Sequence, residues 1–494
     1  MERLRASLML VLVLACATHG VGGEPDIELW YDVTLDGVSI GHSRERIGIA
    51  DDGNIVTAVS TVMLVTRRQD LVRLEISERW TETPAGEPLE YHMTMHTSGR
   101  ETALDLVIDG ETARLRRAIG EDASVESIHV PVGLRFPAAM KRLMVSQGGA
   151  PGRSYSYLGF DAETENVETF TVTIEGEETL EVLGDQRPLI RYTIECAARP
   201  GLPVREWRDT SGLLWRYELP TAGMALTRTT KENALAEKEA FDLLTASAVS
   251  SNVLLRAPYR VDDALVELWL DDGADIEPFM IEDARQSIEG RTDRGVLLRV
   301  ARATPEPDEV MRFPVLSAPM MDSMEGNPLM QTWHPRLLGV AARQAWGTDQ
   351  NIWRTSKNIE AWVFQEVDKK GFGTGFASAT ETLDSREGDC SEHAVLMAAM
   401  VRSLSIPARL ASGLTHYQGE FLYHMWVEVW TGDEWYALDP TIGEGSVDAM
   451  HIKFGESTAK RGNVSDLALG ILRVFGRLSL RVVEYTEGGE TVRP

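Results

Sequence analysis

Three residues in the carboxyl-terminal part of the chain have the types and local contexts that nucleophilic catalysis by a thiol requires. They are Cys390, His424 and Asp439. A thiolate attacks a carbonyl carbon, an imidazole moves the proton and a carboxylate orients the imidazole, which together allow acyl transfer through a thioester. The chain has only three cysteines in 494 residues. Because so few cannot form a disulfide framework, a lone Cys in such a context is a candidate for chemistry.

The elements around these residues are expected to bring them together. A turn over 386–389 precedes an apolar helix from Cys390 to about Leu404. Cys390 then lies in the first turn, where unpaired backbone N–H groups and the helix dipole favour a thiolate, and its own N–H can serve an oxyanion. His424 lies in a predicted strand over 421–430, and Asp439 follows another over 435–438. If these strands are antiparallel neighbours, His424 and Asp439 lie side by side.

The motifs that contain these residues resemble those of the transglutaminase-like superfamily. They are Gly388-Asp389-Cys390, Ile406–Arg409, His424–Val429, Trp435 and Asp439–Thr441. The resemblance implies a papain-related α+β fold. It further implies Cys390 as the nucleophile, His424 as general base and acid, and Asp439 as the residue that orients the imidazole.

The sequence before this region is rich in predicted strands. Short alternating segments separated by turn residues, such as Asp109-Gly110, predict a large antiparallel sheet or open barrel with one buried face over residues 24–228. Pro137–Val145 is the expected helix within it. The predicted fold class is therefore α+β, with a papain-like or transglutaminase-like domain preceded by a large antiparallel β-rich region.

The remaining segments complete the predicted domain organisation. Residues 229–325 are predicted as a helical connector, over Thr230 to Asp242, followed by a smaller β unit. The catalytic domain is expected over 326–455 and a C-terminal extension over 456–494. The expected strands of the smaller unit are Asn252–Leu255, Asp263–Leu270 and Gly295–Val300, and the expected first helices of the catalytic domain are Pro335–Trp346 and Asn351–Val367.

Residues 1–23 have the composition of an export signal. Two arginines precede the apolar run Leu8–Ala17, which is too short for a permanent membrane helix. Ala15-Cys16-Ala17 is a site for ordinary secretion, whereas Val13–Cys16 resembles a bacterial lipobox, which would leave Cys16 as a lipidated tether to a membrane. Both alternatives predict export to the periplasm, the cell envelope or the medium.

Charge and motifs exclude some functions and leave others open. With 49 Lys plus Arg against 76 Asp plus Glu, the net charge of −27 argues against a nucleic-acid partner. No metal-binding or cofactor-binding motif is expected. We expect a protein or peptide substrate, with a hydrolase (peptidase or amidase) as the first hypothesis. The alternatives are a protein-glutamine gamma-glutamyltransferase that cross-links proteins, and a non-catalytic binding or scaffolding protein of the cell envelope.

Other reactive side chains have simpler interpretations. His393 lies three residues after Cys390 and is interpreted as structural or as part of the rim of the site. His416 is expected in a loop without a catalytic partner. The Ser457–Lys460 match to a serine acyl-enzyme pattern lacks its companion motifs, and Cys196 is expected in the core.

Overall fold

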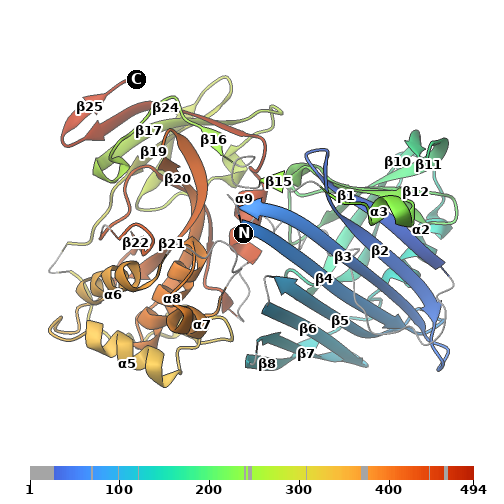
Figure 1. Cartoon of the computed structure of the whole chain (residues 1–494), viewed down its shortest axis with the longest axis horizontal. Helices are drawn as coiled ribbons and strands as arrows, with labels where there is room; N and C mark the ends of the chain where they lie inside the picture. The colour runs from blue at the N-terminus through green and yellow to red at the C-terminus, as the bar shows by residue number, and fades with distance from the viewer. Residues whose placement is uncertain are drawn as a thin grey trace. The chain divides into compact units, whose positions relative to one another are not determined.

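The computed structural model describes residues 27–494, except for 68–69, 98–99, 121, 239–240, 243–247, 307–308, 369–376, 444 and 461–464. The predicted export segment 1–23, with Cys16, lies outside the described residues. The chain forms two compact units that divide near residue 243 (Figure 1). Within the described ranges, no helix is long and apolar enough to cross a lipid bilayer.

The first unit is built on one large sheet of 15 strands. Its strands are β1 (Ile27–Leu35), β2 (Val38–Ile49), β3 (Ile55–Arg67), β4 (Asp70–Glu82), β5 (Pro88–Thr97), β6 (Arg100–Asp109), β7 (Thr112–Ile119), β8 (Asp122–His129), β9 (Ser154–Asp161), β10 (Asn166–Val182), β11 (Asp185–Cys196), β12 (Val204–Arg208), β13 (Leu214–Leu219), β14 (Met224–Thr229) and β15 (Phe241–Asp242). The order is β8-β7-β6-β5-β4-β3-β2-β1-β14-β13-β12-β11-β10-β9, with β15 beside β3.

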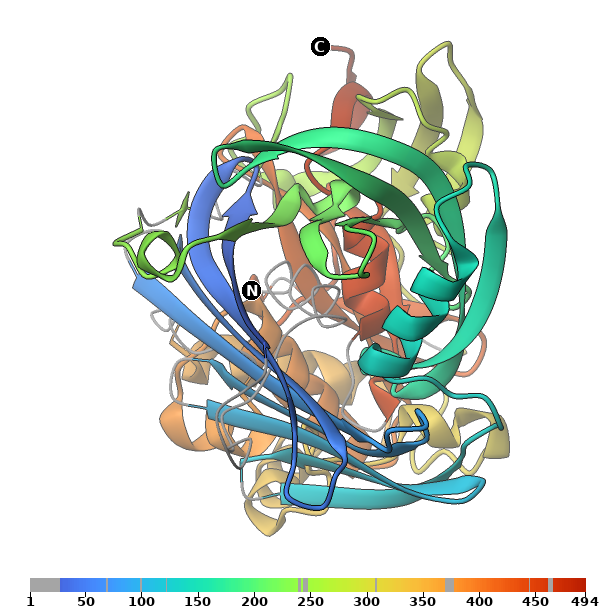
Figure 2. The same cartoon turned by 90° about the vertical axis from the view of Figure 1, so that its right-hand side faces the viewer.

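Alternation of apolar and polar residues along these strands explains why one face of the sheet is buried. In β4, for example, Val72, Leu74 and Ile76 are buried, and they lie on one side of the strand. The sheet curves strongly, and α2 (Pro137–Gln147) lies inside the curve (Figure 2). The predicted helix in this region is confirmed and extends two residues further.

The predicted hairpin near Asp109 is confirmed, with its turn shifted by one residue. β6 ends at Asp109 and β7 begins at Thr112, so the turn residues are Gly110 and Glu111. Gly110 has a φ of 61°, a left-handed conformation that glycine adopts without a steric penalty.

The predicted connector helix over Thr230 to Asp242 is largely wrong. Among the described residues of this segment, only α3 (Lys231–Ala234) is helical, and the chain then enters β15 beside β3. The ammonium group of Lys238 lies 2.7 Å from Asp32 Oδ1 on β1 and also donates to the Asn233 carbonyl. These tertiary contacts outweigh the helix propensity of the segment.

The second unit contains two five-stranded sheets and the helices that cover one of them. Its strands are β16 (Val249–Ser250), β17 (Val261–Leu270), β18 (Gln286–Arg291), β19 (Gly295–Ala301), β20 (Ala408–Tyr417), β21 (Glu420–Trp430), β22 (Trp435–Leu438), β23 (His451–Ser457), β24 (Leu478–Glu487) and β25 (Glu490–Val492), and its helices are α5 (Pro335–Gln344), α6 (Ile352–Glu366), α7 (Ala379–Ser385), α8 (Cys390–Ser403) and α9 (Ser465–Leu472). One sheet has the order β16-β21-β20-β23, with β22 paired to β21. The other has the order β18-β19-β17-β24-β25.

The predicted strand over Asn252–Leu255 does not form. Only Val249–Ser250 pairs with β21. Asn252 instead uses its side-chain amide to bond both the N–H and the carbonyl of Val482 on β24, at 2.7 and 2.9 Å. A side chain thus supplies the pairing that a strand backbone would have provided.

Helix α8 is the most deeply buried element of the second unit. Every residue from Ser391 to Arg402 is buried. It packs against β20 and β21 on one side and against α5, α6 and α7 on the other (Figure 1). The predicted helix from Cys390 to about Leu404 is confirmed, as are the helices corresponding to α5 and α6.

The predicted segments 229–325, 326–455 and 456–494 all contribute to this second unit. β17 and β19 from the first of them share a sheet with β24 from the last. Their apolar side chains form one core with residues of the sheet that contains β20, β21 and β23. The predicted fold class, an α+β domain preceded by a large antiparallel β-rich region, is confirmed.

Candidate active site

Cys390 is the first residue of α8, and a capping box fixes the helix end that holds it. Asp389 Oδ1 accepts a hydrogen bond from the Ser391 N–H at 2.9 Å, and Glu392 Oε2 accepts one from the Asp389 N–H at 3.0 Å. The side chain of Cys390 is partly exposed, whereas its helical neighbours are buried. A backbone N–H at this position has no partner within the helix, so Cys390 offers its own N–H to an oxyanion.

Two acidic side chains share the buried amino-terminal end of α8. Burial, together with the negative charge of Asp389, raises the pKa of Glu392 to about 8. The raised pKa of Glu392 favours a proton on this carboxyl group, which reduces the negative charge at the helix end. The positive end of the helix dipole thus remains available to a thiolate on Cys390.

Strand pairing brings His424 and Asp439 together, as the sequence predicts. His424 lies on β21, and Asp439 directly follows β22, which is antiparallel to β21. His424 Nε2 lies 2.7 Å from Asp439 Oδ2, and Thr441 donates its N–H to Asp439 Oδ1 at 2.8 Å. An ionised carboxylate only accepts hydrogen bonds, so Nε2 carries the proton. Cys390 also lies close enough to His424 to raise the pKa of the imidazole.

The charges of His424 and Asp439 stabilise each other. Burial by itself would lower the pKa of His424, but Asp439 and the hydrogen bonds with Asp439 and Cys390 raise that pKa well above its ordinary value. Burial would raise the pKa of Asp439, but the charge and hydrogen bond of His424 hold that pKa well below its ordinary value. The dyad is thus stabilised as an imidazolium and a carboxylate, a state suited to donate a proton to a leaving group.

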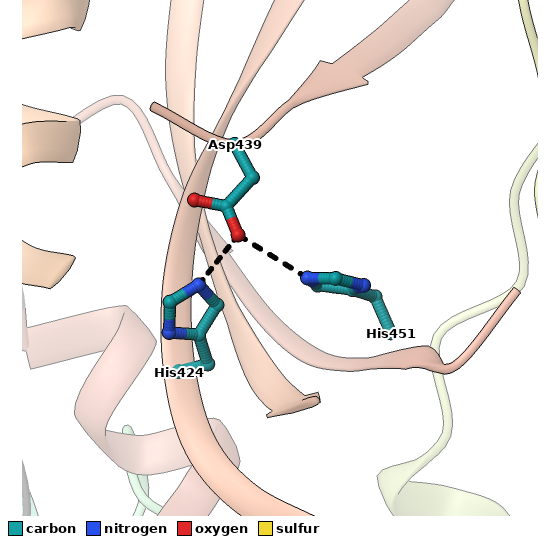
Figure 3. A group of neighbouring side chains, drawn as sticks. All are labelled: His424, Asp439 and His451. Atoms are coloured by element: carbon teal, nitrogen blue, oxygen red, sulfur yellow. Dashed lines mark hydrogen bonds and ion pairs between the residues drawn. The ribbon is translucent and has the colours of Figure 1, made fainter. Parts of the chain in front are cut away.

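The structure adds a residue that the sequence analysis missed, His451. Its Nε2 lies 3.3 Å from Asp439 Oδ2, so that one oxygen faces both histidines (Figure 3). Two histidines and a carboxylate are also a set that binds zinc, and the three facing atoms lie within 4.8 Å of one another. The 2.7 Å contact with His424 is of hydrogen-bond length, and we therefore describe the group as a hydrogen-bonded network.

A second missed residue, Glu360 on α6, holds the loop that carries Asp439. Its Oε1 accepts from the Gly445 N–H at 3.0 Å, and its carboxyl group lies close enough to Asp439 for the two to interact electrostatically. Burial, followed by the nearby charge of Asp439, raises the pKa of Glu360 to about 8. No motif in the sequence marks Glu360, because its role depends on a helix and a loop that are about 80 residues apart.

We expect Glu360→Gln to change how the stability of the second unit depends on pH. Since the folded state holds the Glu360 proton up to about pH 8 and the unfolded state releases it near pH 4.5, wild-type stability should fall as the pH rises between these values. Gln does not titrate, so the variant should gain on the order of 1–4 kcal/mol relative to wild type between pH 5 and 8.5. Unfolding midpoints at both pH values test this. Glu366→Gln, in a half-exposed position on the same helix, is the control, and parallel pH curves for wild type and Glu360→Gln would contradict the prediction.

The other candidate residues lie away from this group or have structural contacts. His393 is fully buried and donates from Nδ1 to the Asp389 carbonyl at 2.7 Å. His416 was expected in a loop, but it lies on β20 and donates from Nε2 to the Val253 carbonyl at 3.1 Å. Lys460, of the serine acyl-enzyme pattern, pairs with Asp322.

One known protein family matches the part of the chain that contains these residues. Residues 339–440 match the sequence model of the transglutaminase-like superfamily, a range that contains Cys390, His424 and Asp439. We refer to this range as the transglutaminase-like segment. The transglutaminase-like segment includes Glu360 and ends directly after Asp439, so His451 lies beyond it. Among curated proteins, none matches the sequence.

Several solved structures are similar to parts of the chain. The "putative cysteine protease" from Cytophaga hutchinsonii is 15% identical, with 50% of this chain and 85% of that chain covered and a TM-score of 0.30. A beta-barrel-like protein with a domain of unknown function from Brucella abortus is 13% identical, with 41% and 94% covered and a TM-score of 0.32. Scores of this size do not establish a shared fold.

Proposed function

We propose that the protein is an exported cysteine hydrolase, a peptidase or amidase, that cleaves amide bonds through a thioester on Cys390. The observation that carries this proposal is the position of His424, which is hydrogen-bonded to Asp439 and lies close enough to Cys390 for the thiol group to raise the pKa of the imidazole. This arrangement lies within a transglutaminase-like segment. A thiol, an imidazole and a carboxylate in this order are the groups that acyl transfer requires.

The reaction follows from the positions of these groups. Transfer of the Cys390 thiol proton to His424 gives the imidazolium and a thiolate, and the thiolate sulfur attacks the carbonyl carbon of the substrate amide. The oxyanion that forms is stabilised by the N–H at the amino end of α8. His424 then gives its proton to the leaving amine, which departs and leaves an acyl group on sulfur. Water attacks the thioester, His424 accepts its proton and returns it to the sulfur, and a carboxylic acid is released.

Hydrolysis is the proposed outcome because it needs nothing beyond these groups and water. Transfer to a lysine amine would require a second site that binds the amine and excludes water from the thioester. The same thioester is common to both reactions, so the test must compare the two acceptors directly.

The test incubates the mature protein with glutamine-containing peptides, with and without an added primary amine. Hydrolysis predicts release of ammonia or of a cleaved peptide, independent of the amine, and no product that contains the amine. An amine-containing product as the main species would instead indicate a transferase. Cys390→Ala is the control, and turnover that persists in this variant would refute the cysteine mechanism.

Export is part of the proposal, and Cys16 provides its test. If the lipobox is used, the mature protein begins at Cys16 with an attached lipid, and Cys16→Ser should release it from the membrane fraction. If ordinary secretion applies, the mature protein begins near Thr18 and Cys16→Ser has little effect. Fractionation with mass spectrometry of the amino terminus distinguishes the two, and an intact Met1 on the mature protein would contradict both.

A further inference from the structure

His451 connects the proposed dyad to a second carboxylate. It is the first residue of β23, and its side chain is only 1% exposed. One ring nitrogen, Nε2, lies 3.3 Å from Asp439 Oδ2. The other, Nδ1, lies 2.9 Å from Asp448 Oδ1. That oxygen also accepts from the Met450 N–H at 2.7 Å, which fixes Asp448 itself.

The contacts define the protonation state of His451. An ionised carboxylate only accepts hydrogen bonds, and each nitrogen of this ring faces one, so both nitrogens carry protons. Burial alone would lower the pKa of His451, but the charges and hydrogen bonds of Asp448 and Asp439 raise it. The ring is therefore an imidazolium between two carboxylates.

The surroundings of His451 contain few other charges. The Arg285 guanidinium donates to the carbonyls of Asp448 and His451, at 2.7 and 3.4 Å. The Trp426 ring lies edge-on, with ring centres 5.4 Å apart. The titratable or charged groups that face His451 or its carboxylate partners from the neighbouring elements are Asp439, Asp448, His424, Glu360, Arg285 and His416.

We propose that His451 is a positioning residue: anchored by Asp448, it holds the carboxylate of Asp439 in line with His424. This inference rests on the proposed function, because it assigns to His451 a role in the activity of that same site. Asp439 Oδ2 has hydrogen-bond partners on two sides, and Oδ1 is held by Thr441. The carboxylate therefore cannot rotate without breaking several bonds.

The positive charge of His451 has a second effect. It partly neutralises Asp439 and so reduces the attraction of that carboxylate for the proton on His424. His424 then releases this proton more readily to the leaving group. The geometric and electrostatic contributions can be separated by two substitutions.

The substitutions His451→Asn and His451→Gln separate the geometric contribution of His451 from its electrostatic contribution. The amide of Asn reaches the position of Nδ1, keeps Asp448 and loses Asp439, whereas the amide of Gln reaches the position of Nε2 and keeps Asp439. We expect kcat to fall about 10–100-fold in His451→Asn and much less in His451→Gln, with KM unchanged in both. In both variants the alkaline limb of the pH–rate profile should move to higher pH, because the His424 imidazolium loses a positive neighbour.

His416→Gln is the matched control, since His416 is a buried histidine of the same sheet that bonds a backbone carbonyl outside the dyad. It should leave kcat and the pH profile unchanged. Full kcat in His451→Asn, or equal losses in both His451 variants with an unshifted profile, would overturn the proposal.

A measurement on the wild-type protein keeps the test independent of variant folding. Histidine NMR should find His451 protonated on both nitrogens at pH 7, and a neutral His451 ring would overturn the proposal. If the wild type lacks thiol-dependent turnover, the proposed function fails. The NMR result still decides whether the Asp439–His451–Asp448 network exists as described.

Discussion

Replacing Cys390 with alanine should abolish labelling by a thiol-directed probe and reduce amide hydrolysis by at least about 10,000-fold. Cys390 is the partly exposed thiol at the amino end of α8, and it lies close enough to His424 to raise the pKa of that imidazole. Alanine is a good helix former, and the cap depends on Asp389 and Glu392, so the helix should remain intact. Circular dichroism and unfolding midpoints should match those of the wild type.

Cys196→Ala is the control for this experiment. Cys196 is buried in the first unit, where burial raises the pKa of its thiol to about 11. It therefore stays protonated and unreactive at neutral pH, and its replacement should leave labelling and turnover unchanged. Labelling that persists in Cys390→Ala, or that disappears in Cys196→Ala, would assign the nucleophile elsewhere.

Replacing His424 with alanine should cost nearly as much activity as replacing Cys390. Without the imidazole, the thiol loses its proton acceptor, and the leaving amine loses its proton donor. Initial rates of peptide hydrolysis measure the loss. If His424→Ala keeps full activity while a change of His416 or His393 removes it, the base is misassigned.

Asp439→Asn should have a smaller effect than His424→Ala, of up to about 10,000-fold. The amide keeps the shape of the side chain but removes the charge that raises the pKa of His424. Because Asp439 acts through His424, the double variant His424→Ala/Asp439→Asn should be scarcely less active than His424→Ala. Additive losses across this pair would mean that Asp439 acts independently, for instance only in the turn before Pro440.

The candidate nucleophile, base and orienting acid could be predicted because each lies in a short motif on a strongly patterned element. The helix after Cys390 is a long apolar run, and the strand around His424 is rich in aromatic and β-branched residues. The antiparallel pairing that brings Asp439 to His424 follows from two adjacent strands joined by a short connection. Local sequence thus contained most of the information about this part of the site.

The residues that the sequence analysis missed depend on long-range packing. His451 reaches Asp439 because β23 pairs with β20, across a separation that no local pattern encodes. The predicted helix after Thr230 was wrong for a similar reason, because the contact of Lys238 with Asp32 on β1 favours another conformation of this segment. Sequence periodicity predicts elements, whereas partners far along the chain are determined only when the whole unit is assembled.

The pairing of β17 with β24 has a consequence for the order of events during synthesis. β17 ends at Leu270, and the strand beside it does not begin until Leu478, about 200 residues later. At typical translation speeds of about 5–20 residues per second, roughly 10–40 s separate the emergence of the two strands from the ribosome. During that interval β17 has only β19 as a neighbour, and one of its edges is open. The unit that carries the candidate active site therefore completes its core only after nearly the whole chain has been made.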